Sequence, residues 1–211
     1  MEQKYIRGVY AILPADLDTD CLLEKAENAL KGGIQTLQFR DKKSAYKRAF
    51  KRAKALRECT TVYGAQLIIN DSVQLANEAH ADGVHLGRDD VAKLANIRAD
   101  VGDHMLIGIT CRADAMFAKL ALEHGADYVS FGAVFGSRSK PDVPVLGLPR
   151  LNKARQMFPD SNICAIGGIT TENIASIKHA GATSAAIISG LFSADHIESK
   201  ARELIERWNK A

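Results

Sequence analysis

The chain has 211 residues, of which 46% are hydrophobic and 25% charged, a composition typical of a globular protein with a sizeable core. The 28 basic residues barely exceed the 25 acidic ones, so charge gives no reason to expect nucleic acid or an acidic membrane as a partner. The first residues lack the apolar region of a signal peptide, and no apolar run approaches the ~20 residues of a membrane helix. The four cysteines form no CxxC pair, which fits reduced thiols and a cytoplasmic location.

Short apolar runs alternate with amphipathic segments along the chain. Eight of these runs are almost entirely apolar, which is typical of strands that are covered on both faces. They are residues 8–13, 36–40, 67–70, 83–86, 106–110, 128–132, 162–166 and 184–189. The segments between them, such as CLLEKAENALKGG and AYKRAFKRAKALREC, have the apolar spacing of amphipathic helices.

Eight strand-plus-helix units in this length predict α/β architecture, with a single closed (β/α)8 TIM barrel that spans residues 1–211 as one domain. A doubly wound open sheet is the alternative. The only long connection, residues 133–149, carries three prolines, and a loop of that length in a compact domain is usually functional or disordered.

The active-site residues of such barrels lie at the carboxyl ends of the strands and in the loops that follow. The predicted strand ends carry acids, cations, amides, hydroxyls and glycines, which we expect to gather at one mouth. They are Gln38, Phe39, Arg40, Asp41, Lys42, Asn70, Asp71, Asp89, Asp90, Thr110, Ser137, Arg138, Ser139, Lys140, Gly167, Gly168, Ser189 and Gly190.

The charged members of this set suit a diphosphate. Asp71 and Asp90, from adjacent strand ends, can share one Mg²⁺, which proteins usually hold by one or two carboxylates plus phosphate oxygens. Arg40, Lys42 and Lys140 supply positive charge for the remaining phosphate oxygens. Each lysine could instead be an ordinary solvated loop residue, and only its position at a strand end favours a function.

A second phosphate is expected elsewhere on the same mouth. The Gly167-Gly168 turn and the loop after the eighth strand lie where such barrels commonly bind phosphate through backbone N–H groups. The two glycines could also serve a tight turn alone. The sequence therefore predicts two phosphorylated ligands, one of them held with a metal.

Six strings in the chain resemble those of the thiamine-phosphate synthase family, in the same order and over nearly the whole length. They are LQFRDK, LIINDSVQLANEAHADGVHLGRDD, IGIT, DYVSFGAVFGSRSK, AIGGIT and AAIISG. The second string is the most specific, because it joins an Asn-Asp pair to an HLG-x-x-Asp sequence.

The resemblance implies a transferase that condenses 4-amino-2-methyl-5-(diphosphooxymethyl)pyrimidine with 4-methyl-5-(2-phosphooxyethyl)thiazole, giving thiamine phosphate and pyrophosphate. It implies that the pyrimidine diphosphate is bound by Gln38, Phe39, Arg40, Asp41, Lys42, Asn70, Thr110 and Lys140, of which Arg40, Lys42, Thr110 and Lys140 act in catalysis. It implies that Mg²⁺ is held by Asp71 and Asp90. It also implies that the thiazole phosphate is bound by Ser137, Arg138, Ser139, Gly168, Ile188 and Ser189, to which the turn described above adds Gly167.

The chain departs from the family pattern at three places. The family commonly has Ser at Thr110, Pro-Thr-x-Thr-Lys at residues 136–140 and Gln-Glu-Asp at residues 88–90. The hydroxyl groups are retained in this chain, and Asp90 is the residue that matches the family aspartate.

The reaction that fits is a dissociative displacement. The aminopyrimidine ring expels pyrophosphate, and the thiazole nitrogen captures the resulting cation. Such a reaction needs electrostatic stabilisation of the departing diphosphate and no strong general base, and none is evident in the sequence.

Several of these residues also have plainer interpretations. Asp71 and Asp90 each precede a predicted helix and could be N-caps, but as a pair on neighbouring strand ends they favour a metal, which leaves the cap to Ser72. We expect His85 to be packed in the barrel rather than catalytic, and the cysteines to be small buried hydrophobes.

Two other functions remain open at this stage. One is a thiazole tautomerase, a paralogue that shares the barrel and a thiazole phosphate site but needs no metal-held diphosphate. The other is a non-catalytic phosphate-binding barrel, because a fold does not fix a function. In each case the expected partners are small molecules, and the chain is compatible with a homo-oligomer.

Overall fold

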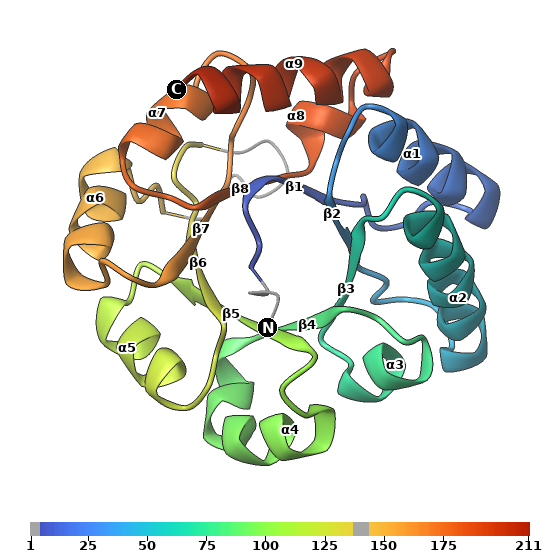
Figure 1. Ribbon diagram of the computed structural model, residues 1–211, viewed down its shortest axis with the longest axis horizontal. Helices are drawn as coiled ribbons and strands as arrows, with labels where there is room; N and C mark the ends of the chain where they lie inside the picture. The colour runs from blue at the N-terminus through green and yellow to red at the C-terminus, as the bar shows by residue number, and fades with distance from the viewer. Residues whose placement is uncertain (1–4, 137–143) are drawn as a thin grey trace.

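A computed structural model describes residues 5–136 and 144–211. Eight parallel strands close into a barrel in chain order, and β1 (Gly8–Ile12) pairs with β8 (Ser184–Ile187) to complete the ring. The predicted TIM barrel is confirmed, and this pairing excludes the open sheet. Figure 1 shows the ring of strands surrounded by helices, with the chain entering β1 from within the ring.

The remaining strands are β2 (Thr36–Phe39), β3 (Gln66–Asn70), β4 (Gly83–Leu86), β5 (Leu106–Arg112), β6 (Tyr128–Gly132) and β7 (Asn162–Ile166). The helices are α1 (Thr19–Lys31), α2 (Tyr46–Val62), α3 (Val73–Glu78), α4 (Leu94–Val101), α5 (Ala115–Glu123), α6 (Leu148–Met157), α7 (Ile174–His179), α8 (Ser189–Phe192) and α9 (Ile197–Lys210), with a 3-10 turn, η1 (Arg88–Lys93), between β4 and α4.

Four predicted strands end at a different residue in the structure, β1 and β2 by one position and β5 and β8 by two. β5 continues to Arg112, so Thr110 lies within this strand and not at its end. β8 stops at Ile187, and Ser189 begins the short helix α8. The reason in each case is local, because hydrophobicity does not distinguish the last residue of a strand from the first residue of the following turn.

Successive side chains point to opposite faces of each strand, so the strands contribute to two separate apolar clusters. The larger cluster lies between the strands and the helices and includes Leu37, Ile69 and Leu56 of α2. The smaller one fills the inside of the barrel and consists of Ile6, Tyr10, Ile12, Ile68, Leu106, Tyr128, Cys164 and Ala186. Polar side chains at inward positions of the same strands therefore share the barrel interior.

Short polar side chains set where several helices begin. The Ser72 hydroxyl accepts a hydrogen bond from the Leu75 N–H at 3.1 Å and so caps α3, as predicted. Asp18 and Asp114 cap α1 and α5 in the same way. All four cysteines are free thiols, but only Cys111 and Cys164 are buried, so the prediction of buried cysteines holds for half of them.

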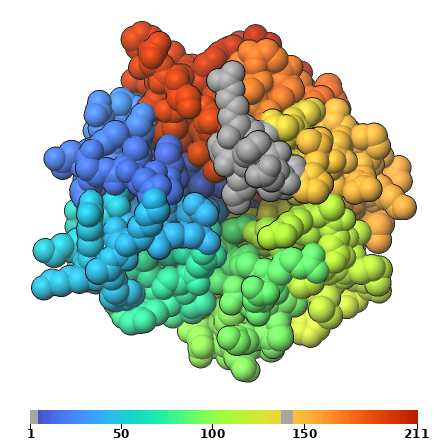
Figure 2. All heavy atoms as spheres, turned by 180° about the vertical axis from the view of Figure 1, so that it is seen from behind, coloured from blue at the N-terminus to red at the C-terminus, as the bar shows by residue number. Residues whose placement is uncertain are grey.

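Figure 2 shows the opposite end of the barrel, where segments follow one another around the face in chain order from blue to red. No helix among the described residues is long and apolar enough to cross a membrane.

Candidate functional site at the barrel mouth

The carboxyl ends of β2 and β3 bring a cation and an acid together. The Lys42 Nζ lies 2.9 Å from the Asp71 carboxylate, and both side chains are about half exposed. Asn70 precedes Asp71 as the last residue of β3 and is partly exposed. Because β2 and β3 are hydrogen-bonded neighbours, these groups form one edge of the mouth. For these residues the structure agrees with the expectation that strand-end side chains gather at one mouth.

Asp71 has an unusual backbone conformation. Its φ is 65°, in the left-handed region that L-residues other than Asn and Asp seldom adopt. The Asp71 N–H donates to the carbonyl oxygen of His85 at 2.8 Å, which ties the acid to β4. This backbone conformation turns the carboxylate towards Lys42 at the mouth, and backbone strain of this kind is often associated with functional sites.

The segment from Gln38 to Lys42 does not present all its side chains to the mouth. Phe39 is buried in the cluster between strands and helices, beneath the Arg52 guanidinium at 5.7 Å. Asp41 is paired with the Arg52 side chain at 2.6 Å and accepts hydrogen bonds from two backbone N–H groups of the same loop. Within β2 the alternation directs Gln38 inward, where its amide contacts Tyr10, and in the loop that follows Lys42 pairs with Asp71 at the mouth.

Asp41 is consequently held as a carboxylate by its surroundings. Burial alone would raise its pKa, but hydrogen bonds from Ser44 and Lys43 and the charge of Arg52 outweigh this effect and hold the pKa below the ordinary value. The side chain is 9% exposed. Sequence reasoning placed Asp41 among the substrate ligands, and the contacts in the structure are those of a residue that fixes the β2–α2 loop.

Asp90 lies in η1, directly after β4. Its carboxylate accepts a hydrogen bond from the Gly87 N–H at 3.1 Å, so it closes the turn from within rather than capping it from the preceding position. Asp90 is partly exposed and Asp89 is exposed. Arg88 turns away to pair with Asp114 and to cover the Phe117 ring.

His85 and Thr110 meet inside the mouth. The His85 Nε2 lies 2.8 Å from the Thr110 hydroxyl, and its Nδ1 lies 2.9 Å from the Tyr128 hydroxyl. Burial lowers the pKa of His85 to about 4, although the nearby Asp71 charge acts in the opposite direction. The imidazole is therefore neutral at physiological pH, and its position inside the barrel agrees with the sequence prediction.

The loops after β6, β7 and β8 are in close contact. Gly168 has a φ of 64°, and a Cβ at this position would lie 2.4 Å from the Gly136 carbonyl oxygen. A Cβ at Gly190 would lie 2.2 Å from the Ile169 carbonyl oxygen. Glycine is required at both positions, and the backbones of three loops converge there.

Other predicted residues lie in or next to these loops. Gly167 also has a positive φ, of 103°. Ile188 packs against the barrel interior and Ser189 is exposed at the start of α8. The predicted residues Ser137, Arg138, Ser139 and Lys140 lie outside the described residues.

The donor set at the mouth suits Mg²⁺. Asp71 and Asp90 follow neighbouring strands, and carboxylates combined with ligand oxygens are what Mg²⁺ prefers. Within residues 5–136 and 144–211 no group of three or more His, Cys, Asp and Glu side chains is placed to hold a metal. An ion bound by these residues would thus depend on the two carboxylates together with oxygens of the ligand.

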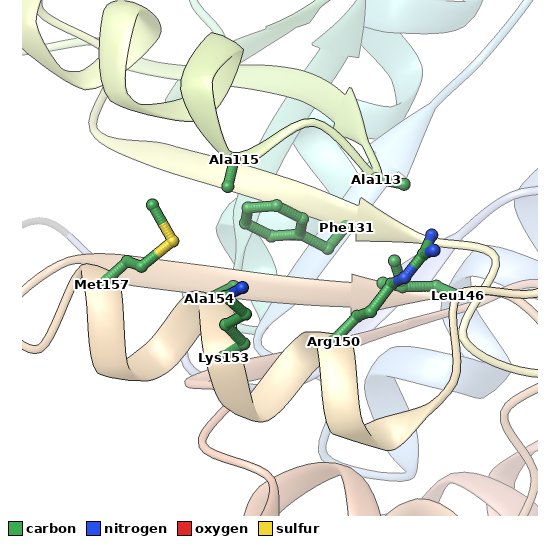
Figure 3. A pocket seen from close by; sticks show the side chains of 8 residues that line it. All are labelled: Ala113, Ala115, Phe131, Leu146, Arg150, Lys153, Ala154 and Met157. Carbon is green, nitrogen blue, oxygen red and sulfur yellow. The ribbon is translucent and has the colours of Figure 1, made fainter.

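Two surface hollows differ in their position relative to the predicted site. One, of about 210 Å³, is formed where the β2–α2 loop meets the end of β3 and includes Asp41, Asn70 and Ser72. The other, of about 340 Å³, lies outside the barrel between α5 and α6, with Phe131 as its floor and Arg150 at its edge (Figure 3). The first adjoins the predicted site and the second does not.

The sequence analysis did not identify Tyr10 and Tyr128 as residues near the site. Both are fully buried inside the barrel and their hydroxyl groups are 3.2 Å apart, although 118 positions separate them in the chain. Gln38 donates to the Tyr10 hydroxyl at 2.6 Å. A tyrosine at an otherwise apolar inward position was the available signal, because a buried hydroxyl requires a hydrogen-bond partner.

Comparisons with known proteins show the family of the chain. The family model for thiamine monophosphate synthase matches residues 9–191. A thiamine-phosphate synthase from Methylobacillus flagellatus is 43% identical over 205 residues, which cover 97% of this chain and 96% of that protein. Another, from Thioalkalivibrio sulfidiphilus, is 43% identical and covers 94% of both chains.

Solved structures give the same result. A thiamine phosphate pyrophosphorylase from Pyrococcus furiosus has a TM-score of 0.85 at 27% identity, with 96% of each chain covered. A 3-hexulose-6-phosphate synthase from Salmonella typhimurium, at 15% identity and a TM-score of 0.78 with 96% of this chain and 99% of that chain covered, shares the fold alone.

The closed barrel, with charged and hydroxyl-bearing side chains at its carboxyl mouth, defines an enzyme of the (β/α)8 class. The similarity over nearly the whole length is more specific. The chain belongs to the thiamine monophosphate synthase family and is a transferase.

Proposed function

We propose that the chain condenses 4-amino-2-methyl-5-(diphosphooxymethyl)pyrimidine with 4-methyl-5-(2-phosphooxyethyl)thiazole, giving thiamine phosphate and pyrophosphate in a Mg²⁺-dependent reaction. The observation that carries this proposal is the Lys42–Asp71 pair at the mouth, next to Asn70 and on the edge that leads to Asp90. A cation beside a carboxylate of this kind suits a metal-held diphosphate, because the acid can bind the metal while the lysine contacts phosphate oxygens.

Mg²⁺ would be held by Asp71 and Asp90 and would supply Lewis-acid stabilisation of the departing diphosphate. Arg40 and Lys42 would bind phosphate oxygens from the β2 side. Lys140, from the loop after β6, would add a third cation. Each of these charges acts most strongly as negative charge builds up on the leaving group, so the side chains favour the transition state over the bound substrate.

The hydroxyl and amide groups of the mouth would orient the pyrimidine diphosphate. Asn70 and the Thr110 hydroxyl are the described residues assigned to this role, and Gln38 adds an amide from the barrel interior. Phe39 and Asp41 would support the same ligand indirectly through the β2–α2 loop, because their side chains contact Arg52.

The second substrate would bind across the mouth. The Gly167-Gly168 turn and the start of α8 at Ser189 would offer backbone N–H groups to its phosphate, with Ile188 beside them. Ser137, Arg138 and Ser139 would complete this pocket. This arrangement would bring the two substrates together and exclude water. The cation left on the pyrimidine after pyrophosphate departs would then react with the thiazole nitrogen.

The assay that tests this function combines both substrates, with and without Mg²⁺, and follows thiamine phosphate and pyrophosphate together. Equal amounts of both products in the presence of Mg²⁺ are expected. A thiazole tautomerase would convert a thiazole substrate without releasing pyrophosphate, and a non-catalytic barrel would give no turnover. Either result would overturn the proposal.

The metal assignment has a matched control in the chain. Asp71→Asn removes one carboxylate charge and keeps a residue that tolerates a positive φ, so metal affinity in calorimetry should fall by about tenfold or more while thiazole phosphate affinity is kept. Asp16 also has a positive φ, of 69°, and also pairs with a lysine, at 2.9 Å from Lys43. Asp16→Asn should change neither affinity. Equal losses of both affinities in Asp71→Asn would show that Asp71 is structural.

A further inference from the structure

A continuous chain of hydrogen-bonding side chains crosses the barrel interior. Its five members, each from a different strand, are Gln38, Tyr10, Tyr128, His85 and Thr110. The successive distances are 2.6 Å, 3.2 Å, 2.9 Å and 2.8 Å. One end is the buried Gln38 amide and the other is the Thr110 hydroxyl at the mouth. The proposed function uses the two ends and leaves the three central groups unexplained.

The barrel is built to make room for this chain. A Cβ at Gly108 would lie 1.9 Å from the Tyr128 ring, so only glycine at this position of β5 admits the ring. The Tyr128 ring then stacks on His85 with centroids 5.5 Å apart and meets Tyr10 edge-on at 6.3 Å. These contacts fix the three rings, and with them the hydroxyl and imidazole positions.

The direction of the hydrogen bonds follows from the Gln38 end. The Gln38 amide nitrogen can only donate, so the Tyr10 hydroxyl accepts and its own hydrogen is directed to Tyr128. Burial raises the pKa of both phenols, so each keeps a hydrogen to donate. Tyr128 in turn donates to the His85 Nδ1. A neutral imidazole that accepts at Nδ1 carries its proton on Nε2.

The last bond in this sequence sets the state of Thr110. The protonated Nε2 of His85 donates to the Thr110 hydroxyl oxygen, so the hydroxyl hydrogen is not used within the chain. If every donor and acceptor in this series of hydrogen bonds were exchanged, the Thr110 hydroxyl would donate to the His85 Nε2. The Gln38 carbonyl oxygen would then have to face the Tyr10 hydroxyl. The two directions therefore predict different histidine tautomers.

We propose that His85 is a positioning residue, which the Gln38–Tyr10–Tyr128 chain holds in the Nε2–H tautomer so that the Thr110 hydroxyl presents its hydrogen to an acceptor on the substrate. This inference deepens the proposed function, on which its catalytic consequence rests. A diphosphate oxygen or a pyrimidine ring nitrogen is an acceptor of the required kind. Threonine in place of the serine expected there keeps this donor.

The tautomer can be measured without substrate. Two-bond ¹H–¹⁵N correlation spectra of protein labelled with ¹⁵N-histidine distinguish protonated from unprotonated ring nitrogens, and His85→Gln assigns the signals. We expect a protonated Nε2 and an unprotonated Nδ1 in the wild type at neutral pH. A protonated Nδ1, or an exchanging mixture of both tautomers, would overturn the proposal.

Tyr128→Phe removes the donor to Nδ1 and is expected to produce that mixture. With both substrates and Mg²⁺ saturating, its turnover should fall about tenfold, the effect of one lost oriented hydrogen bond. In a Thr110→Val background the same change should have little further effect, whereas Thr110→Ser should keep most of the wild-type rate. If Tyr128→Phe lowers the turnover by the same factor in the wild type and in Thr110→Val, Tyr128 acts only on packing.

A tyrosine elsewhere in the protein, outside the hydrogen-bond chain, serves as a control for the loss of a tyrosine hydroxyl. Tyr63, at the end of α2, donates to Glu27 at 3.3 Å on the surface, so Tyr63→Phe should change neither the tautomer nor the turnover. The two readouts also separate this inference from the proposed function. If neither substrate is converted, the spectra still decide the tautomer, and if the tautomer is wrong, the wild-type assay is unaffected.

Discussion

Asp41 and Asp71 follow neighbouring strands and have opposite surroundings. Asp41 is 9% exposed and paired with Arg52, whereas Asp71 is about half exposed and paired with Lys42. The difference arises in the loop after β2, where Asp41 pairs with Arg52 of α2 and the next residue, Lys42, pairs with Asp71 at the mouth. A buried, fully paired acid contributes to stability, and an exposed acid on a strained backbone is available to a ligand.

The Asp41–Arg52 pair gives a pH-dependent prediction. The folded-state pKa of Asp41 lies below its ordinary value of 3.8, so its stabilisation is complete above that pH and is lost as the pH falls through the lower folded value. Asp41→Asn should lower the free energy of unfolding at pH 7 by about 3–5 kcal/mol, because Arg52 is left buried without a carboxylate.

Urea unfolding of both proteins at pH 7 and at pH 3 tests this. The difference in unfolding free energy between wild type and Asp41→Asn should be smaller at pH 3, because below the ordinary pKa of 3.8 the unfolded chain takes up a proton on Asp41 more readily than the folded protein does. An equal difference in the free energy of unfolding at both pH values would mean that the Asp41 charge does not stabilise the fold.

At the residue scale the sequence predicted positions better than contacts. Lys42, Asn70 and Asp71 were placed correctly, because parallel strands end at one mouth. The partners of Asp41 and of Tyr128 could not be predicted in the same way. They depend on which face of a strand a residue occupies and on contacts across the barrel, between residues far apart in the chain.

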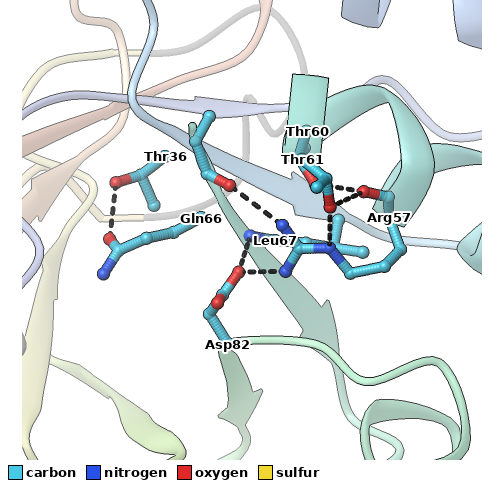
Figure 4. Close-up of polar contacts among 8 residues, drawn as sticks. Thr36, Arg57, Thr60, Thr61, Gln66, Leu67 and Asp82 are labelled. Carbon is cyan, nitrogen blue, oxygen red and sulfur yellow. Dashed lines mark hydrogen bonds and ion pairs between the residues drawn. The ribbon is translucent and has the colours of Figure 1, made fainter. Parts of the chain in front are cut away.

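The elements are joined by a repeated contact at the amino ends of the strands. Before β4, Asp82 accepts hydrogen bonds from the Leu67 N–H at 2.7 Å and from Arg57 of α2 (Figure 4). Before β6, Asp127 accepts from the Ile107 N–H at 2.6 Å and from Arg98 of α4. Each contact ties a helix to two strands.

The same pattern continues in altered form before β8. Thr183 stands where the other two units have aspartate, and its hydroxyl donates to the Ile163 carbonyl oxygen at 3.1 Å. Arg155 of α6 donates to the Gly181 carbonyl oxygen at 2.7 Å. The sequence shows the repeat as Ala-Asp, Ala-Asp and Ala-Thr before strands four, six and eight. Its structural role could not be predicted, because it depends on contacts with arginines of the preceding helices.

These contacts lie at the end of the barrel where residues serve stability rather than catalysis. Asp82→Asn should therefore lower the free energy of unfolding by about 1–2 kcal/mol and leave kcat unchanged. Glu58→Gln, at an exposed position next to Arg57, removes the same charge without a contact to the strands and should change neither quantity. A drop in kcat with Asp82→Asn would show that this end is coupled to the mouth.

For the whole molecule, closure joins the first strand to the last strand, and the last helix covers this seam. β1 pairs with β8, and α9 packs across α1, α7 and β1. Gly32 allows this approach, because a Cβ there would lie 2.5 Å from that of Ala201. The eight-unit repeat predicts a closed ring, but the packing of α9 over its seam follows only from the positions of the surrounding helices.

Trp208 lies at this seam and gives a prediction for the whole fold. It is 6% exposed, its backbone carbonyl accepts from Lys178 of α7 at 2.9 Å, and its indole lies beside Gly8 of β1. Trp208→Ala should lower the free energy of unfolding by about 3–5 kcal/mol, because it removes a large buried side chain where three elements meet. In Trp208→Phe the phenyl ring fills part of the space left by the indole, so the free energy of unfolding should fall by less than in Trp208→Ala.

Trp208 is also the only tryptophan of the chain, so its fluorescence reports on the seam alone. If the barrel unfolds as one cooperative unit, urea transitions followed by fluorescence and by far-UV circular dichroism should coincide, because breaking the β1–β8 closure removes packing from every unit. Titrations of the wild type with both probes decide this. A fluorescence transition at lower urea than the dichroism transition would mean that the seam opens first, and closure would then not be what makes the barrel cooperative.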